Sequence, residues 1–206
     1  MLRPQAAYAL WAATYPPRPH NRMMEVEQAV MLQLLPSMTG LSALDAGCGS
    51  GRYLQLLADR GARVVGVDQS EEMLRRAKRI GTTLRGDLAA LPIRSESLDV
   101  VVSGLALGDI ADLDSTIREF ARVLKPGGSL VYSVVHPRGR DEGWQRTFET
   151  PQGTFAVDSH WHTRDQHEKA WKNAGLTLEE TREPEEMALV VRCELTADSR
   201  KMKAES

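Results

Sequence analysis

The sequence predicts an α/β domain with a mostly parallel sheet, helices on both faces and an antiparallel hairpin at its C-terminal end. Between residues 42 and 136, short apolar runs alternate with segments of helical periodicity, which is typical of parallel strands joined by crossover helices. A glycine-rich turn follows the first strand. Two strand-like runs, 176–183 and 187–196, are so close in sequence that a tight turn must join them, and they should be antiparallel.

The first forty residues precede the sheet. Residues 1–20 contain the proline-rich PPRPH and are expected to form an irregular or briefly helical lead-in. From Asn21, apolar residues recur at helical spacing between Met23 and Leu34. Pro36 ends this pattern, so a helix is expected before the first strand.

Residues 42–81 are expected to form two strands and two helices. The apolar runs 42–47 and 63–68 are the strands, and residues 51–60 keep one apolar helical face between them. Ser70 is placed to cap the next helix, because its hydroxyl accepts a hydrogen bond from a free backbone N–H. Gly81 is expected to end that helix.

Three further strands, 82–87, 98–107 and 129–136, complete the parallel part of the sheet. Residues 112–125 form a helix with one apolar face before the last of them, and Pro126-Gly127-Gly128 is expected to break that helix. These assignments place helices between most of the successive strands, although none is expected between 82–87 and 98–107.

The segment 137–162 shows no period and is rich in glycine and aromatic residues. Thr163 and Gln166 have the spacing of a capping box, which predicts a helix running to Asn173. Gly175 is expected to stop it. The hairpin strands follow.

Length and charge limit the class of protein. The chain has 206 residues, a net charge of −2 and two cysteines, so we expect one main domain, no broad basic surface for a large nucleic acid and no disulfide framework. No apolar run reaches the roughly 18 residues that a membrane span needs. We therefore expect a soluble, cytoplasmic protein.

The run LDAGCGSGRY (44–53) is the strongest chemical signal. Its glycines allow the backbone to approach a ligand closely, and the helix that follows offers free backbone N–H groups. Asp68 ends the second strand and is placed to accept hydrogen bonds from both hydroxyls of a ribose. This arrangement predicts an adenosine-containing cofactor, a class that includes NAD and FAD.

Three features favour S-adenosylmethionine (SAM) over NAD. The spacing is GxGxG, and no glycine stands at Arg52 or Tyr53 to complete GxGxxG. Asp45 lies just before the glycines, where it would attract a cationic amino group and repel a pyrophosphate. The terminal hairpin is also unexpected in a plain dinucleotide-binding domain.

The chain resembles the class I SAM-dependent methyltransferases, in particular the methyltransferase type 11 group. The resemblance lies in LDAGCGSG (44–51), VVGVDQS (64–70), RGDLAALP (85–92), LDVVVSGLALGDI (98–110) and EFARVLKPGGSLVYSVVHP (119–137). It implies a Rossmann-like seven-stranded sheet whose last strand is antiparallel. It also implies a SAM pocket at the carboxyl ends of the first four strands.

The resemblance also implies the cofactor contacts. Asp68 would hold the ribose, Asp87 would accept from the adenine amino group, and Leu88 would line the adenine. The full set of implied cofactor residues is Tyr15, Asp45, Gly47, Gly49, Gly51, Arg52, Asp68, Gln69, Met73, Asp87, Leu88, Ser103, Gly104 and Leu105. The family often has histidine where Gly108 and Asp109 stand here, which puts in doubt any role borrowed for those two positions.

Methyl transfer mainly needs donor and acceptor to be positioned, although a hydroxyl acceptor also needs a general base. The candidate bases are His136, His160 and His162; the alternatives are a strand-end cap for the first and a polar loop for the other two. No third ligand accompanies the last two, so no metal is predicted. His167 is interpreted as a packing or surface residue. The candidate acceptor-binding residues are Trp11, Asp109, Trp144 and Trp161.

These observations predict a lid at residues 1–40, a SAM-binding domain at 41–196 with a substrate-covering loop at 137–162, and a polar tail at 197–206. The predicted activity is methyl transfer from SAM to an O or N atom of a small-molecule acceptor. One alternative is a catalytically inactive SAM-binding domain that acts as a regulator or partner, and another is a nicotinamide oxidoreductase. An acceptor carried on a protein also stays open.

Overall fold

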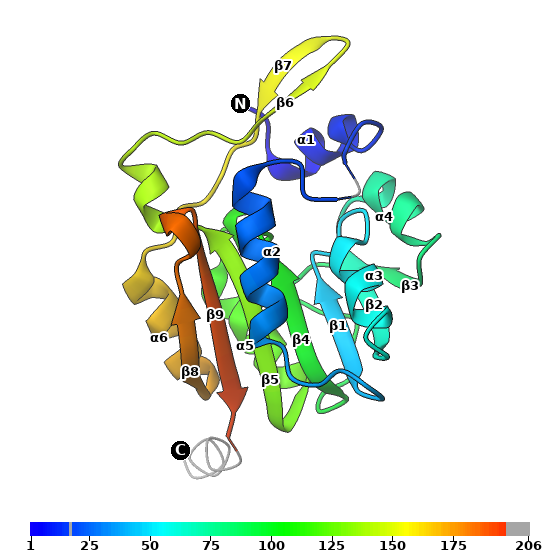
Figure 1. Cartoon of the computed structure of the whole chain (residues 1–206), viewed down its shortest axis with the longest axis vertical. Helices are drawn as coiled ribbons and strands as arrows, with labels where there is room; N and C mark the ends of the chain where they lie inside the picture. Colours follow the sequence, from blue (N-terminus) through cyan, green and yellow to red (C-terminus); the bar gives the residue numbers. More distant parts are fainter. Residues whose placement is uncertain (17, 197–206) are drawn as a thin grey trace.

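A computed structural model describes residues 1–16 and 18–196 of the chain. Its centre is a seven-stranded sheet with the strand order β3-β2-β1-β4-β5-β9-β8 (Figure 1). The strands are β1 (Ser42–Ala46), β2 (Arg63–Asp68), β3 (Thr82–Arg85), β4 (Leu98–Gly104), β5 (Leu124–Val135), β8 (Leu176–Arg182) and β9 (Ala188–Leu195). Strands β1 to β5 are parallel, and β9 runs antiparallel to both β5 and β8. The predicted fold class is confirmed.

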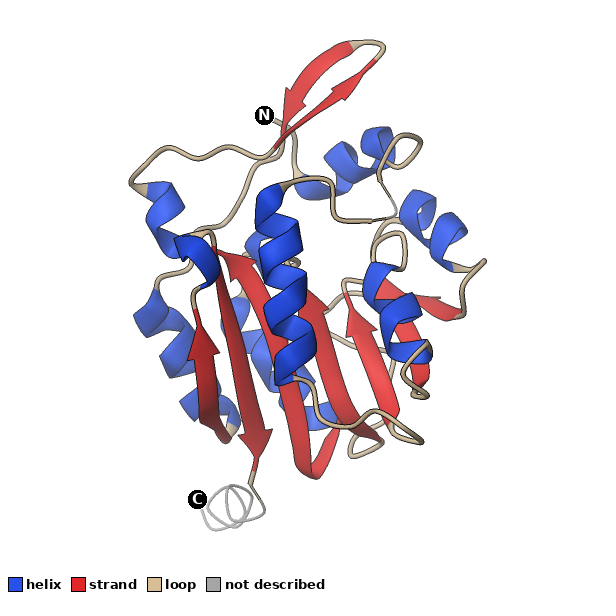
Figure 2. Cartoon of the chain, viewed as in Figure 1, coloured by secondary structure: helices blue, strands red, loops and turns tan. Residues whose placement is uncertain are grey.

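Helices cover both faces of this sheet (Figure 2). The α-helices are α1 (Pro4–Trp11), α2 (Arg22–Leu34), α3 (Arg52–Ala58), α4 (Glu71–Ala77), α5 (Leu113–Val123) and α6 (Arg164–Ala174). One apolar cluster joins α2 and α3 to the sheet through residues such as Met31, Leu57 and Val100. A second cluster joins α5 and α6 to the sheet through Phe120 and Val101. Val100 and Val101 are neighbours in β4 and pack on opposite faces of the sheet, because successive side chains of a strand point to opposite faces.

Local capping signals give the helix starts where the sequence predicts them. The Asn21 side chain accepts from the backbone N–H of Met24, and the Ser70 hydroxyl accepts from that of Met73. Thr163 and Gln166 form the reciprocal capping box at the start of α6. These interactions involve residues three apart in sequence, so they are visible without tertiary information.

Several boundaries differ from the expectation. Helix α4 ends at Ala77 rather than at Gly81, and β3 and β4 end at Arg85 and Gly104 rather than at residues 87 and 107. Strand β5 begins at Leu124, which pairs with Leu98, so Pro126-Gly127-Gly128 forms an irregularity near the start of a long strand. The register shifts between Leu98 and Val100 at this point, because the glycine-rich stretch adds chain on one side of the pair.

The segment expected to be irregular contains a small hairpin of β6 (Thr147–Thr150) and β7 (Gly153–Ala156). Beyond it, the backbone of Leu2 bonds to Ala156 and Asp158, which ties the start of the chain to this segment. Figure 1 shows the hairpin and α1 together above the carboxyl ends of the parallel strands. The predicted tail, 197–206, lies outside the described residues. In the described part of the chain, no helix is long and apolar enough to cross a membrane.

Candidate active site

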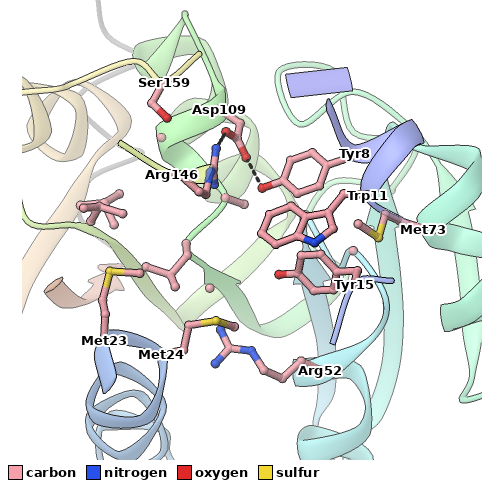
Figure 3. A pocket seen from close by; sticks show the side chains of 18 of the residues that line it. Tyr8, Trp11, Tyr15, Met23, Met24, Arg52, Met73, Asp109, Arg146 and Ser159 are labelled. Carbon is pink, nitrogen blue, oxygen red and sulfur yellow. Dashed lines mark hydrogen bonds and ion pairs between the residues drawn. The ribbon is translucent and has the colours of Figure 1, made fainter. Parts of the chain in front are cut away.

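A cavity of about 470 Å³ lies at the carboxyl ends of β1, β2, β4 and β5 (Figure 3). Two segments cover this edge of the sheet, residues 1–16 and the segment that contains β6 and β7, and they are called the covering segments below. In an open α/β sheet this edge is where ligands bind, at the point where the strand order reverses, here between β1 and β4. The predicted site residues that line it are Trp11, Tyr15, Asp45, Gly47, Gly49, Arg52, Asp68, Met73, Gly104, Leu105, Asp109, Trp144, His160, Trp161 and His162. These predicted residues therefore lie around one cavity.

Six predicted residues do not line the cavity: Gly51, Gln69, Asp87, Leu88, Ser103 and His136. Asp87 accepts a hydrogen bond from the backbone N–H of Ala89, and the Leu88 side chain is buried. Ser103 is also buried. The roles of these residues toward a cofactor remain predictions.

His136 also lies outside the cavity lining. Its Nδ1 accepts from the backbone N–H of Arg138, and its Nε2 is 3.6 Å from a carboxylate oxygen of Glu183. These are the contacts of a strand-end cap, which was the alternative interpretation of this histidine.

The glycine loop, residues 47–51, is open at Gly49 and closely packed at Gly47. Gly49 has φ +51°, and a Cβ added there would meet no atom within 4 Å. Gly47 has φ +74°, and its added Cβ would lie 2.4 Å from the Cβ of Ala106. A side chain is thus excluded at Gly47 by a close approach and by its left-handed backbone, while the backbone at Gly49 remains accessible to a ligand.

Two acids, Asp45 and the partly buried Asp68, hold this loop. Asp45 accepts from the backbone N–H of Leu54 at 2.7 Å, and burial raises its pKa to about 7. Asp68 accepts from the backbone N–H groups of Gly49 and Ser70, each at 2.8 Å, and burial raises its pKa as well. Without a ligand, desolvation therefore disfavours the charged form of both carboxylates. A nearby cation or hydroxyl donor would stabilise that charged form.

Glu27 was not predicted, although it is fully buried and contacts two residues that line the cavity, Arg52 and Tyr53. It accepts hydrogen bonds from Arg52 at 2.9 Å, from the Tyr53 hydroxyl at 2.8 Å and from the Ser133 hydroxyl at 2.5 Å. A signal was present in the sequence, because Glu27 falls on the same helical face as the buried Met24. Its carboxylate fixes Arg52 beside the cavity.

A second cluster ties the covering segments to the sheet. Asp109 was predicted as a site residue, but its two partners, Tyr8 and Arg146, were not. The Tyr8 hydroxyl of α1 donates to Asp109 at 2.9 Å, and the Arg146 guanidinium pairs with the same carboxylate (Figure 3). The guanidinium also lies 5.5 Å from the centre of the Tyr8 ring. Burial raises the pKa of Tyr8 well above its usual value, so the phenol stays protonated and donates. Asp109 thereby contacts both covering segments.

Aromatic rings fill the junction between those segments. Trp11 stacks on Phe148 of β6 with ring centres 4.8 Å apart, and the Tyr15 ring meets Trp11 edge-on at the same distance. Aromatic pairs at such distances favour offset-stacked or edge-on packing. Residues 1–16 and the segment with β6 and β7 thus form one cover over the cavity.

Three histidines also line the cavity: His160, His162 and His167. Nε2 of His162 is 2.7 Å from the carbonyl oxygen of Ile110, so that nitrogen carries a proton and only Nδ1 can accept one. His167 is fully buried rather than at the surface, and its Nδ1 is 2.9 Å from the Tyr132 hydroxyl. Among the described residues, no group of three His, Cys, Asp or Glu side chains is arranged to hold a metal ion.

Comparisons with known proteins agree with this geometry. Residues 44–132 match the model of a family described as methyltransferase domain. A malonyl-[acyl-carrier protein] O-methyltransferase of Yersinia pestis is 34% identical over 141 residues, which is 66% of this chain and 49% of that protein. An uncharacterized protein of Haemophilus influenzae is 30% identical over 162 residues, or 71% of this chain and 63% of that protein. The chain thus spans about half to somewhat under two thirds of these curated relatives.

A solved S-adenosylmethionine-dependent methyltransferase from Mesorhizobium loti superposes with a TM-score of 0.71 and 26% identity, covering 82% of this chain and 97% of that one. The likeness therefore extends well beyond the 44–132 segment. Residues 44–132 are thus similar in sequence to a methyltransferase domain, and the fold is that of a solved SAM-dependent methyltransferase, as the resemblance in the sequence implies.

Proposed function

We propose that this protein transfers the methyl group of SAM to an O or N atom of a small-molecule acceptor. The observation that carries the proposal is one cavity that is lined by the glycine loop, Asp45 and Asp68 together with three histidines. Such a cavity has room for a cofactor and an acceptor side by side. The methyltransferase-domain match over residues 44–132 supports the same activity.

The residues at the glycine loop fit SAM. The open backbone at Gly49 allows close approach, and Asp68 at the end of β2 is at the position that suits a ribose. Asp45, whose pKa burial raises to about 7, suits the cationic amino group of the amino-acid portion. When bound, SAM supplies a methyl group that is already activated by the positive charge on sulfur.

The protein's contribution to the reaction is then mainly positional. The cover of α1 and the β6–β7 segment excludes water, and the cavity walls hold acceptor and donor for an in-line displacement. If the acceptor atom is a hydroxyl oxygen, His160 and the Nδ1 of His162 are the candidate bases. An amine acceptor only has to be neutral when it attacks.

The first experiment is a calorimetric titration with SAM and with S-adenosylhomocysteine (SAH), using wild type and Asp68→Ala. We expect both ligands to bind wild type and the variant to lose roughly 1–3 kcal/mol of binding free energy, the scale for hydrogen bonds to a charged group. Glu72→Gln, on the partly exposed first turn of α4, is the matched control. Absence of binding to wild type would contradict the proposal.

The alternative is a SAM-binding domain without catalysis that acts as a regulator or partner. Binding data cannot separate it from an enzyme, whereas turnover can. We expect incubation with SAM and a panel of small carboxylic acids, phenols and amines to release SAH faster than SAM alone. The panel should include an acyl carrier protein loaded with malonyl, because the Yersinia pestis relative is named for that acceptor. Equal release with and without every acceptor favours the regulatory alternative.

A further inference from the structure

Two residues that line the cavity each have a side-chain nitrogen that is shielded from solvent and lacks a hydrogen-bond partner. These atoms are Nε2 of His167 and Nε of Arg146. The described part of the chain has five buried side-chain polar atoms of this kind, and only these two belong to residues that line the cavity. Buried polar groups in folded proteins are nearly always paired, so such exceptions need an explanation. A ligand in the cavity would supply the missing partner.

The hydrogen-bond chain behind His167 fixes which of its ring nitrogens carries a proton. Nε1–H of Trp171 donates to the Tyr132 oxygen at 2.7 Å. The hydroxyl proton of Tyr132 then has the Nδ1 of His167, at 2.9 Å, as its acceptor. Nδ1 is therefore unprotonated, and a neutral His167 must hold its proton on Nε2.

His167 is also neutral at ordinary pH. The side chain is fully buried, and desolvation, followed by the neighbouring His162, lowers its pKa to about 4. With Nδ1 occupied by Tyr132 and Nε2 protonated, His167 has no free acceptor site for a proton. It is a fixed hydrogen-bond donor and not a base.

Arg146 offers a second donor of the same kind. Its guanidinium is permanently charged, and one terminal nitrogen pairs with Asp109. This pair leaves the Nε–H without a partner. Both unpaired atoms are therefore N–H donors, and an ammonium or alkyl group could satisfy neither of them.

We propose that the acceptor molecule carries a carboxylate, and that the Nε2–H of His167 and the Nε–H of Arg146 bind its oxygen atoms. This assignment rests on the proposed function, which makes the cavity a methyltransferase site. It adds the chemical class of the acceptor and gives His167 a role in specificity, held in its donor state by Tyr132 and Trp171. Carboxylates are favoured over neutral carbonyls because hydrogen bonds to an ionised acceptor are stronger.

The first test is nuclear magnetic resonance of the protein with ¹⁵N-labelled histidine, without any ligand, from pH 8 to pH 5. We expect the His167 ring to show a protonated Nε2 and an unprotonated Nδ1 throughout. His167→Gln assigns the signals. A proton on Nδ1, or a doubly protonated ring in this pH range, would overturn the proposal whatever the protein binds.

The second test is a titration of the SAH-saturated protein with acetate, malonate, benzoate and phenylacetate, each compared with 2-phenylethylamine. We expect at least one carboxylate to bind and the amine not to bind. His167→Leu should weaken the carboxylate about 10-fold or more, because a hydrogen bond to a charged group is lost. His167→Gln, which keeps a donor near the Nε2 position, should retain most of the affinity.

Two more variants separate recognition from folding. Arg146→Lys keeps the positive charge beside Asp109 but lacks the Nε–H, so we expect it to weaken the carboxylate while SAH still binds. Lys169→Gln, at an exposed position of the same helix as His167, should change nothing. If no carboxylate binds, or if His167→Leu and Arg146→Lys bind it as wild type does, the proposal is wrong.

The two proposals fail in different ways. Loss of SAH binding to wild type counts against the methyltransferase function, and the carboxylate titration is then repeated without SAH. Normal SAH binding together with a failed carboxylate titration removes only the assigned acceptor class.

Discussion

Asp45 is a buried acid whose ionisation depends on what lies beside it. Its folded-state pKa, about 7, is raised from the usual 3.8 by burial, and the backbone N–H of Leu54 offsets this only in part. Between these two values the folded protein holds a proton that the unfolded chain has released. The free energy of unfolding contributed by Asp45 therefore falls as the pH rises from about 4 to about 7.

A cationic ligand group next to Asp45 would stabilise its charged form and reverse this cost. We therefore expect the affinity for SAH to increase as the pH rises from 6 to 8, with proton release on binding. Isothermal calorimetry in two buffers of different ionisation enthalpy measures both quantities. Asp45→Asn keeps an acceptor for Leu54 and should remove the pH dependence, whereas an unchanged profile in this variant would place the amino group elsewhere.

Glu27 is a second acidic residue in the interior, and its carboxylate has a charged partner. It is fully buried, and Arg52, with 13% of its side chain exposed, depends on it for an ion pair. Replacing one member of a buried pair leaves the other charge uncompensated. Glu27→Gln should therefore lower the free energy of unfolding by about 3 kcal/mol.

Urea unfolding followed by circular dichroism measures this change. Glu25→Gln is the matched control, because its side chain is 57% exposed and its pair with Arg22 is long at 3.7 Å. The control should stay within about 0.5 kcal/mol of wild type. Equal stability of both variants would mean that the three donors around Glu27 find other partners.

At the scale of elements, the cover over the cavity consists of two segments from distant parts of the chain. Tyr8 and Asp109 are 101 residues apart in sequence, and Arg146 reaches the same carboxylate from the segment before β6. Because one carboxylate contacts both, we expect the two segments to open and close together.

Asp109→Asn tests this coupling. The change leaves the Arg146 charge without its counter-ion and weakens the bond from Tyr8. Hydrogen exchange should become faster in α1 and in β6–β7 together, while α5 and α6 keep their protection. Asp114→Asn, at the start of α5, is the control and should exchange as wild type does. Faster exchange in only one of the two segments would show that they open independently.

The sequence predicts elements well where the deciding interactions are local. The caps at Asn21, Ser70 and Thr163 are examples, since each involves residues three apart. The hairpin of β6 and β7 could not be predicted, because Phe148 packs on Trp11, far away in the sequence. A two-stranded ribbon is marginal alone and gains its stability from such packing.

The same distinction applies to the candidate site. The glycine loop, Asp45 and Asp68 follow from short motifs and their order along the chain. Tyr8, Arg146 and His167 carry no local signal, because their environments are created by segments that meet only in the folded protein. Glu27 lies between these cases, since its place on a buried helical face could have been recognised.

For the whole molecule, cofactor binding should be visible as stability. A ligand that binds only the folded state stabilises it by about 2.7 kcal/mol at 100 times its Kd. For a chain of this length, that corresponds to a rise in Tm of roughly 5–10 °C. Differential scanning calorimetry with SAH checks the value, and ATP at the same concentration is the control. An unchanged Tm with SAH would contradict binding at the cavity.

The match to the methyltransferase domain covers 44–132, yet both covering segments lie outside it. Asp45, Asp68 and the glycine loop lie inside the matched range, whereas Trp11, Arg146 and His167 come from the remainder of the chain. Under the proposed function, we therefore expect acceptor preference to change through the remainder of the chain without changes at the glycine loop. An engineer who grafts both covering segments and α6 onto a related sheet should transfer selectivity as one module, provided that Asp109 travels with them.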